Sequence, residues 1–140
     1  MENISEILEK VYEAVKETGK DPVLMIAAYI TQGDERYITR SREARSIITS
    51  IQRKSILEEL LNEYLMDHHL SDEDGSIAAK LTSLAQKTGR SGYDPVLHLS
   101  SWLISGQISY ITKMENARDD ASEINYIEAV HEIVRHHFAH

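Results

Sequence analysis

Six basic side chains between residues 36 and 54 are the part of this sequence with the clearest capacity for chemistry. This segment contains one acidic residue, Glu43, whereas the 140-residue chain as a whole has a net charge of −8. Arginine guanidinium groups bind phosphate and carboxylate groups through paired hydrogen bonds. The candidate partner-binding or anion-binding residues are therefore Arg36, Arg40, Arg42, Arg45, Arg53 and Lys54.

Three interpretations of this basic cluster are open. Residues 113–128 carry two basic and five acidic side chains, and they could face the cluster if the two halves of the chain pack about a pseudo-two-fold axis. An acidic or phosphorylated partner is the second interpretation. Nucleic acid is the third, but the acidic balance of the chain repels phosphate backbones. We expect complementarity within the chain to explain most of the cluster.

The C-terminal histidines raise the question of a metal site. Glu132, His136 and His140 are four residues apart, so they would share one face of a helix. The string that begins at His131 and ends at His136 is one residue longer than a His-Glu-x-x-His zinc motif, which moves the second histidine off the metal-binding face. A solvated helix end explains these residues better, and we expect no bound metal.

Nothing else in the sequence indicates catalysis. The chain has no cysteine, and it shows no nucleophile–base pair, no glycine-rich phosphate loop and no pair of carboxylates at a catalytic spacing. His98 lies in an otherwise uncharged segment and is expected to be a hydrogen-bonded histidine of the core. We expect a protein that is not an enzyme and binds no cofactor.

The composition is typical of a globular cytoplasmic protein. Hydrophobic residues make up 41% of the chain, and no run of eighteen apolar residues predicts a membrane-spanning helix. The acidic start of the sequence lacks the basic and apolar segments of a signal peptide. We expect a cytoplasmic protein that makes no contact with a membrane.

The elements that would position these residues occur twice. Shifted by 73 residues, the segment 21–65 aligns without a gap on 94–138 and has twelve identical residues, far above the rate of about one in twenty expected by chance. Duplication explains this match. We expect a first repeat over residues 1–70, a second and more divergent repeat over 71–140, and one shared core.

Each repeat has the signals of four helices. Asn3 can cap the first helix, and an Asp-Pro pair at 21–22 and 94–95 starts the next helix in each repeat. Gly33 and Gly106 are natural helix ends. The last helices are expected to begin near Ser55 and Asn125. Because residues 22–32 contain no charge, we expect this helix and its counterpart to pack against each other at the centre.

Two short segments between the helices, residues 37–39 and 110–112, have side chains that favour an extended backbone. They follow the helix-ending glycines at equivalent places and recur in both repeats, which suits packing better than phosphorylation of the tyrosines. We predict that they form a short two-stranded antiparallel ladder at the seam between the repeats, with the two isoleucines in the core. The predicted seam residues are Tyr37, Ile38, Thr39, Tyr110, Ile111 and Thr112.

Together these motifs resemble the IreB family of small regulatory phosphoproteins from low-GC Gram-positive bacteria. The likeness covers residues 4–66 well and 77–138 more loosely. The residues that carry it are Gly19-Lys20-Asp21-Pro22, Tyr29, Gly33-Asp34, Tyr37-Ile38-Thr39-Arg40, Ala44-Arg45, Ile48, Arg53, Leu57-Glu58-Glu59-Leu60 and Tyr64-Leu65. Ordinary members have one copy, so this sequence resembles a tandem duplication, and Thr39 and Thr112 stand where members usually have proline.

The resemblance implies an all-α protein without catalytic activity that acts by protein–protein interaction. Members form homodimers, so the two repeats are expected to pack as a pseudo-two-fold dimer-like unit within a monomer. Members are phosphorylated on threonine by a Ser/Thr kinase that senses cell-wall stress, which implies a partner in such a pathway. Because helix is expected from about residue 4, we expect no counterpart of the threonine-bearing tail that precedes their first helix.

Overall fold

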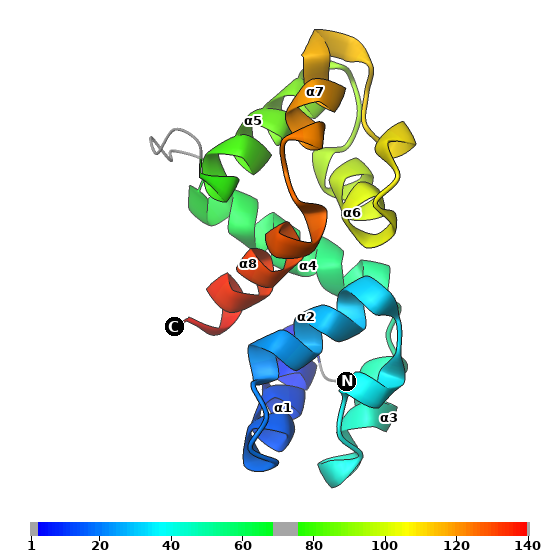
Figure 1. Ribbon diagram of the computed structural model, residues 1–140, viewed down its shortest axis with the longest axis vertical. Coiled ribbons are helices and arrows are strands. Elements are labelled where there is room, and N and C mark those ends of the chain that lie inside the picture. Colours follow the sequence, from blue (N-terminus) through cyan, green and yellow to red (C-terminus); the bar gives the residue numbers. More distant parts are fainter. Residues whose placement is uncertain (1–2, 69–75, 140) are drawn as a thin grey trace.

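The computed structural model describes residues 3–68 and 76–139. Over these ranges the chain forms eight α-helices and four short 3-10 turns, and it forms no strand. The all-α fold with two four-helix repeats is thereby confirmed (Figure 1). The first repeat contains α1 (Ile4–Glu17), α2 (Pro22–Gln32), α3 (Ala44–Thr49) and α4 (Arg53–His68), and the second contains α5 (Ile77–Arg90), α6 (Pro95–Ser105), α7 (Ala117–Ser122) and α8 (Tyr126–Phe138).

Local capping signals set most of the helix ends. The Asn3 side chain accepts a hydrogen bond from the Glu6 N–H at 2.8 Å, and Asp21 accepts one from the Leu24 N–H at 3.2 Å. Helices α2 and α6 end at Gly33 and Gly106, whose φ angles of 74° and 71° are left-handed. The start expected near Ser55 is wrong, because α4 begins two residues earlier, at Arg53.

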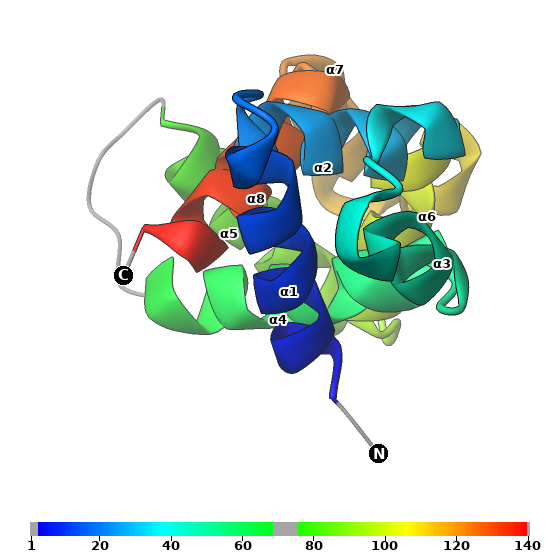
Figure 2. The same cartoon turned by 90° about the horizontal axis from the view of Figure 1, so that it is seen from below.

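The central helices α2 and α6 make their most extensive contacts with the opposite repeat. Helix α2 of the first repeat packs mainly on α8 of the second, and α6 packs mainly on α4, while α2 and α6 meet over a smaller area. Figures 1 and 2 show α8 lying against α2 and α4 near the middle of the molecule. The expected contact between α2 and α6 is present, but it is small, because the last helix of the opposite repeat covers most of each of them.

Buried apolar side chains from both repeats form one continuous core. Ile26, Ile30 and Leu103 are fully buried in it, and the Tyr64 side chain is 1% exposed. Each large apolar side chain that is buried contributes roughly 1.5–3 kcal/mol relative to exposure. The first turns of α2 and α6 are less covered, and Leu24 at 47% exposure shows that these uncharged helices are not buried all round.

The predicted ladder at the seam is not formed. Residues Glu35–Tyr37 and Ile108–Tyr110 are 3-10 turns, η1 and η3, and each packs mainly on helices of its own repeat. Ile38 and Ile111 do lie in the core. Their carbonyl groups accept hydrogen bonds at 2.9 Å from the Nε atoms of Arg45 and Arg118, which satisfies the backbone without a partner strand.

The other residues assigned to the seam also make contacts within their own repeats. The Tyr37 hydroxyl donates to the Gln32 side chain at 2.9 Å. The Thr39 hydroxyl accepts a hydrogen bond from the Ser41 N–H, and the Thr112 hydroxyl accepts one from the Met114 N–H. The seam is instead built from the helix pairs α2–α8 and α4–α6.

Candidate functional site

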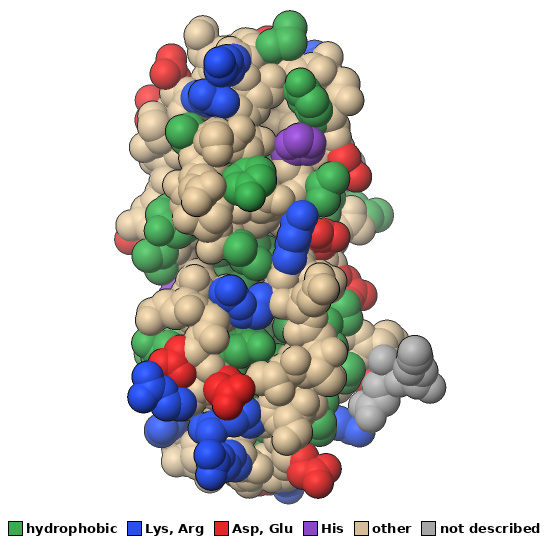
Figure 3. Space-filling view, turned by 90° about the vertical axis from the view of Figure 1, so that its right-hand side faces the viewer, with side chains coloured by type: hydrophobic (Ala, Val, Ile, Leu, Met, Phe, Trp, Pro, Cys, Tyr) green, Lys and Arg blue, Asp and Glu red, His purple; other side chains and the backbone are tan. Residues whose placement is uncertain are grey.

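The six basic residues from Arg36 to Lys54 lie on η1, the loop around α3, and the start of α4 in the first repeat. We call them the basic surface. Lys and Arg side chains gather at the lower end of the space-filling view, the end that α1 and α3 occupy (Figures 1 and 3). The turns and α3 that carry four of these residues pack on α1 and α2, whereas α4, which carries Arg53 and Lys54, also packs on helices of the second repeat.

Three members of the basic surface are paired with carboxylates of their own repeat. Arg36 forms two-pronged contacts with Asp34, with a closest distance of 2.8 Å. Hydrogen bonds from the side chain and the backbone N–H of Arg36 lower the pKa of Asp34 to about 2. Arg42 pairs with Glu17 on α1, and Lys54 lies 3.9 Å from Glu58.

The other three members have no carboxylate partner within residues 3–68 and 76–139. Arg45 donates from Nε to the Ile38 carbonyl, and Arg53 donates from Nη1 to the Ile30 carbonyl at 2.7 Å. Arg40 is exposed and makes no side-chain contact of this kind in the described part of the chain. Arg40 is thus a free cation, and the guanidinium groups of Arg45 and Arg53 are held in place with hydrogen-bond donors to spare.

The Arg53 guanidinium also explains why glycine ends α2. A Cβ atom at Gly33 would lie 2.9 Å from the Arg53 Cζ atom, so the side chain packs directly over the helix end. Nearby Tyr29 is 5% exposed. Burial raises the pKa of Tyr29, while the positive charge of Arg53 opposes this effect. Arg53 therefore packs over the C-terminal end of α2 and also belongs to the basic surface.

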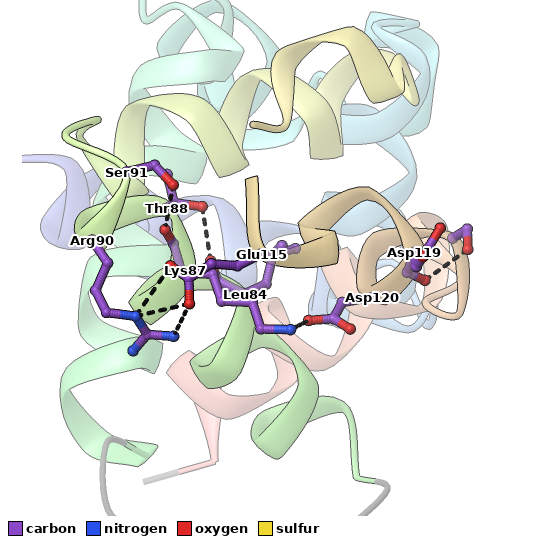
Figure 4. Close-up of polar contacts among 9 residues, drawn as sticks. Leu84, Lys87, Thr88, Arg90, Ser91, Glu115, Asp119 and Asp120 are labelled. Carbon is purple, nitrogen blue, oxygen red and sulfur yellow. Dashed lines mark hydrogen bonds and ion pairs between the residues drawn. The ribbon is translucent and has the colours of Figure 1, made fainter. Parts of the chain in front are cut away.

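Two of the five acidic residues of segment 113–128, Glu115 and Asp120, are paired with α5 of their own repeat. Arg90 holds Glu115 through hydrogen bonds of 2.9 and 3.1 Å, and Lys87 pairs with Asp120 (Figure 4). The Arg90 contact lowers the pKa of Glu115. Helices α3 and α7 lie at opposite ends of the molecule (Figure 1). The expectation that the basic and acidic segments face each other is therefore wrong.

The arginines that recur in both repeats, Arg45 and Arg118, have a structural role. Arg45 and Arg118 make the same hydrogen bond to the carbonyl seven residues earlier in the chain. Around Arg118, however, the second repeat also has a pocket of about 360 Å³ that the sequence analysis did not anticipate. Aligning the repeats shows that Lys113 falls on Arg40 and His98 on Met25, but it does not show that these residues lie close together.

His98 lines this pocket rather than the core. Its Nδ1 atom lies 3.2 Å from the Tyr110 carbonyl oxygen. Because a carbonyl oxygen can only accept a hydrogen bond, Nδ1 carries the hydrogen in this contact. The imidazole also packs on the Tyr93 ring, with centroids 4.9 Å apart. His98 therefore makes a hydrogen bond, as expected, but it is not buried in the core as expected.

The C-terminal histidines join the last helices of the two repeats. His136 Nε2 lies 2.7 Å from an Asp67 oxygen, and His137 Nδ1 lies 2.9 Å from a Glu63 oxygen. Glu132 instead pairs with Arg135. Within the described residues no group of three or more His, Cys, Asp or Glu side chains could hold a metal ion, and His140 lies outside those residues.

Comparison with protein families identifies the chain. The model of the IreB regulatory phosphoproteins matches it twice, over residues 1–66 and 67–139. The protein belongs to the IreB family. The two matches divide the chain where the internal alignment places two repeats, so IreB membership and tandem duplication are established together. Among the described residues of this IreB protein, no helix is both long and apolar enough to cross a bilayer.

Proposed function

We propose that this protein is a non-catalytic regulatory or adaptor protein that acts in the cytoplasm by binding a protein partner. The regulatory role is supported by the family, whose members are described as regulatory phosphoproteins. The basic surface would supply the contact. It contains six basic side chains of the first repeat, three of them without a carboxylate partner among the described residues, in a chain with a net charge of −8. This charge favours an acidic or phosphorylated segment of the partner.

The observation that carries this proposal is the state of Arg40. Its side chain is exposed, and it has no carboxylate partner in residues 3–68 or 76–139. Arg45 and Arg53 lie on the same surface, and their guanidinium groups are positioned by backbone carbonyls. A positioned guanidinium loses little conformational entropy when an anion binds. The surface is therefore suited to recognise carboxylate or phosphate groups.

The family resemblance supports a more specific role in Ser/Thr-kinase signalling that responds to cell-wall stress. In this role the protein would act as a monomer with an internal pseudo-dimer. The packing of α2 on α8 and of α6 on α4 supports the monomer, because each repeat already covers the central helix of the other. The partner would be the kinase or another protein of its pathway.

A pull-down from the native cytoplasm tests the proposed function. The full chain serves as bait, and Arg40→Glu is compared with Lys113→Glu, the matched change at the equivalent position of the second repeat. Both side chains are exposed, so neither variant should disturb folding. We expect Arg40→Glu to lose the bound protein and Lys113→Glu to retain it. Equal capture by all three baits would refute a role for the basic surface.

An anion-binding or nucleic-acid-binding module is the second candidate function, and the same arginines favour it. A nucleic-acid complex would lose affinity steeply with salt, because bound Lys and Arg residues release counterions from the phosphate backbone. Titration of single-stranded and double-stranded oligonucleotides at two salt concentrations distinguishes the candidates. We expect no binding at physiological salt, and tight, salt-dependent binding would favour the second candidate.

A further inference from the structure

The pocket in the second repeat has the composition of an anion site. It lies between α6, the turn η3, a further 3-10 turn η4 (Met114–Asn116) and the start of α7, and its volume is about 360 Å³. Lys113, Arg118 and His98 line it, and none of the residues that line it is acidic. Such a lining is unusual in a chain with a net charge of −8. Basic and hydrophobic side chains and a histidine also share the upper half of Figure 3, over the second repeat.

The cations of the pocket are available to a ligand. Arg118 donates from Nε to the Ile111 carbonyl, which fixes the guanidinium and leaves its two terminal nitrogens without a partner in the described residues. Lys113 is exposed and unpaired in the same part of the chain. The neighbouring carboxylate of Glu115 does not compete, because Arg90 holds it outside the pocket (Figure 4).

The polar donors of the pocket suit phosphate better than carboxylate. Thr112 accepts a hydrogen bond from the Met114 N–H, so its own hydroxyl hydrogen remains free to donate. Ser109 adds a second hydroxyl to the lining. With the ammonium of Lys113 and the free nitrogens of Arg118, these groups offer more donors than the two oxygens of a carboxylate can accept. A phosphate group has three terminal oxygens and can use them.

Two tyrosines give the pocket an aromatic wall. Tyr93 and Tyr110 line it and are 48% and 42% exposed, although tyrosine rings usually bury most of their apolar surface. Tyr93 is held against the His98 ring. Exposed aromatic faces beside fixed cations are the arrangement on which planar rings stack in phosphate-containing ligands.

We propose that this pocket binds a small organic phosphate that carries a planar ring. Lys113 and Arg118 bind the phosphate group, the hydroxyls of Ser109 and Thr112 complete its hydrogen bonds, and the tyrosines contact the ring. The site belongs to the second repeat alone. At the equivalent positions the first repeat keeps Tyr37 in place of Tyr110 but has Lys20 in place of Tyr93 and Met25 in place of His98, so it lacks the Tyr93 ring and the histidine that packs on it.

The test is a calorimetric titration of the full chain with phenyl phosphate, inorganic phosphate and phenol as probes. We expect phenyl phosphate to bind roughly 5- to 150-fold more tightly than inorganic phosphate, which corresponds to the roughly 1–3 kcal/mol that stacking of one ring contributes. Phenol should not bind measurably. Equal affinity for phenyl phosphate and inorganic phosphate, or the absence of binding by both, would overturn the proposal.

Matched variants locate the site. Lys113→Ala and Arg118→Gln should each weaken phenyl phosphate binding about tenfold, while Arg40→Ala and Arg45→Gln, the same changes in the first repeat, should leave it unchanged. Arg45→Gln removes the same hydrogen bond to a carbonyl as Arg118→Gln, so it controls for loss of stability. Lys113 has no ion-pair or hydrogen-bond partner in the described part of the chain whose loss could disturb folding. If the first-repeat variants weaken binding as much as those of the second, the site is not this pocket.

The aromatic wall has its own variant. Tyr93→Ala should reduce the affinity for phenyl phosphate to that for inorganic phosphate and leave the latter unchanged. This result distinguishes a ring contact from a purely electrostatic attraction. Unchanged phenyl phosphate binding in this variant would contradict the role of the aromatic wall.

Discussion

Arg42 of the first repeat and Glu115 of the second occupy the same position and carry opposite charges, and each pairs with the last residue of the first helix in its own repeat. The partner of Arg42 is Glu17 at the end of α1, and the partner of Glu115 is Arg90 at the end of α5. The two backbones agree closely, with φ angles of 54° and 53°. Both repeats therefore have an ion pair at this place, but the positive and negative side chains have changed positions.

This reversal predicts the outcome of a charge exchange in the first repeat. Arg42→Glu places two carboxylates together and should lower the free energy of unfolding by about 0.5–1 kcal/mol, the scale of an exposed pair. Adding Glu17→Arg should restore it, because the double variant reproduces the arrangement of the second repeat. Urea unfolding of the three proteins measures this. A double variant no more stable than Arg42→Glu would show that the pair does not contribute.

The turns that carry these residues are strained, because two consecutive non-glycine residues have left-handed φ angles in each. Glu43 has a φ angle of 60° and Asn116 one of 58°. Since the left-handed region costs most side chains about 1–2 kcal/mol, Glu43→Gly should raise the free energy of unfolding by about 1 kcal/mol. Asn116→Gly should gain less, because asparagine tolerates this region.

The control for these turns is Arg40→Gly, at a residue with a φ angle of −79°. It should not stabilise the protein, because glycine has no conformational advantage there and loses more entropy on folding. Thermal unfolding of the three glycine variants gives the comparison. A gain from Arg40→Gly as large as that from Glu43→Gly would contradict the attribution to backbone strain.

The sequence predicted the features that depend on neighbouring residues. Caps at Asn3 and Asp21 and the helix end at Gly33 are local signals, and the structure has all three. The Tyr-Ile-Thr segments failed as strands because Arg45 and Arg118, seven residues away from the isoleucines, satisfy their carbonyl groups. Strand propensity is easily overridden by such a contact.

Features that depend on distant residues could not be predicted in the same way. The packing of α8 on α2 and of α4 on α6 depends on which apolar faces fit together. The internal alignment contains no information on which helix packs on which. The pocket around Arg118 was missed for a related reason. Its residues come from α6, η3 and α7, and only the fold brings His98 and Lys113 to one surface.

A buried hydroxyl in the second repeat predicts a stabilising change. The Ser100 Oγ atom is fully buried and has no hydrogen-bond partner among residues 3–68 and 76–139, and its equivalent in the first repeat is Ala27. Ser100→Ala should raise the free energy of unfolding by about 1 kcal/mol, because an unsatisfied buried hydroxyl costs roughly 1–3 kcal/mol. Ala27→Ser should lower it in urea unfolding. Destabilisation by Ser100→Ala would indicate that the hydroxyl has a partner after all.

Tyr64 on α4 predicts how stability changes at high pH. Burial, with the negative charge of Glu132 adding to its effect, raises the pKa of Tyr64 to about 12 from an ordinary value of 10.0. Between these values the unfolded chain has lost the phenolic proton and the folded chain retains it. The free energy of unfolding should therefore fall as the pH rises above 10, by on the order of 1 kcal/mol between pH 10 and 11.

The variant Tyr64→Phe should show a smaller loss of stability over this range, because the group that titrates is gone. Tyr93→Phe is the matched control, since the Tyr93 ring is 48% exposed, and it should behave as the unchanged protein does. Denaturant unfolding at pH 9, 10 and 11 measures the difference. The same alkaline loss in all three proteins would show that Tyr64 does not cause it.

Each repeat covers the central helix of the other, and the mass of the protein in solution tests this relationship most directly. Because α8 covers α2 and α4 covers α6, no second chain is needed to complete the core. Sedimentation equilibrium over a range of concentrations should give a single species of 16.0 kDa. A stable species of twice that mass, persisting on dilution, would contradict the claim that the two repeats complete each other.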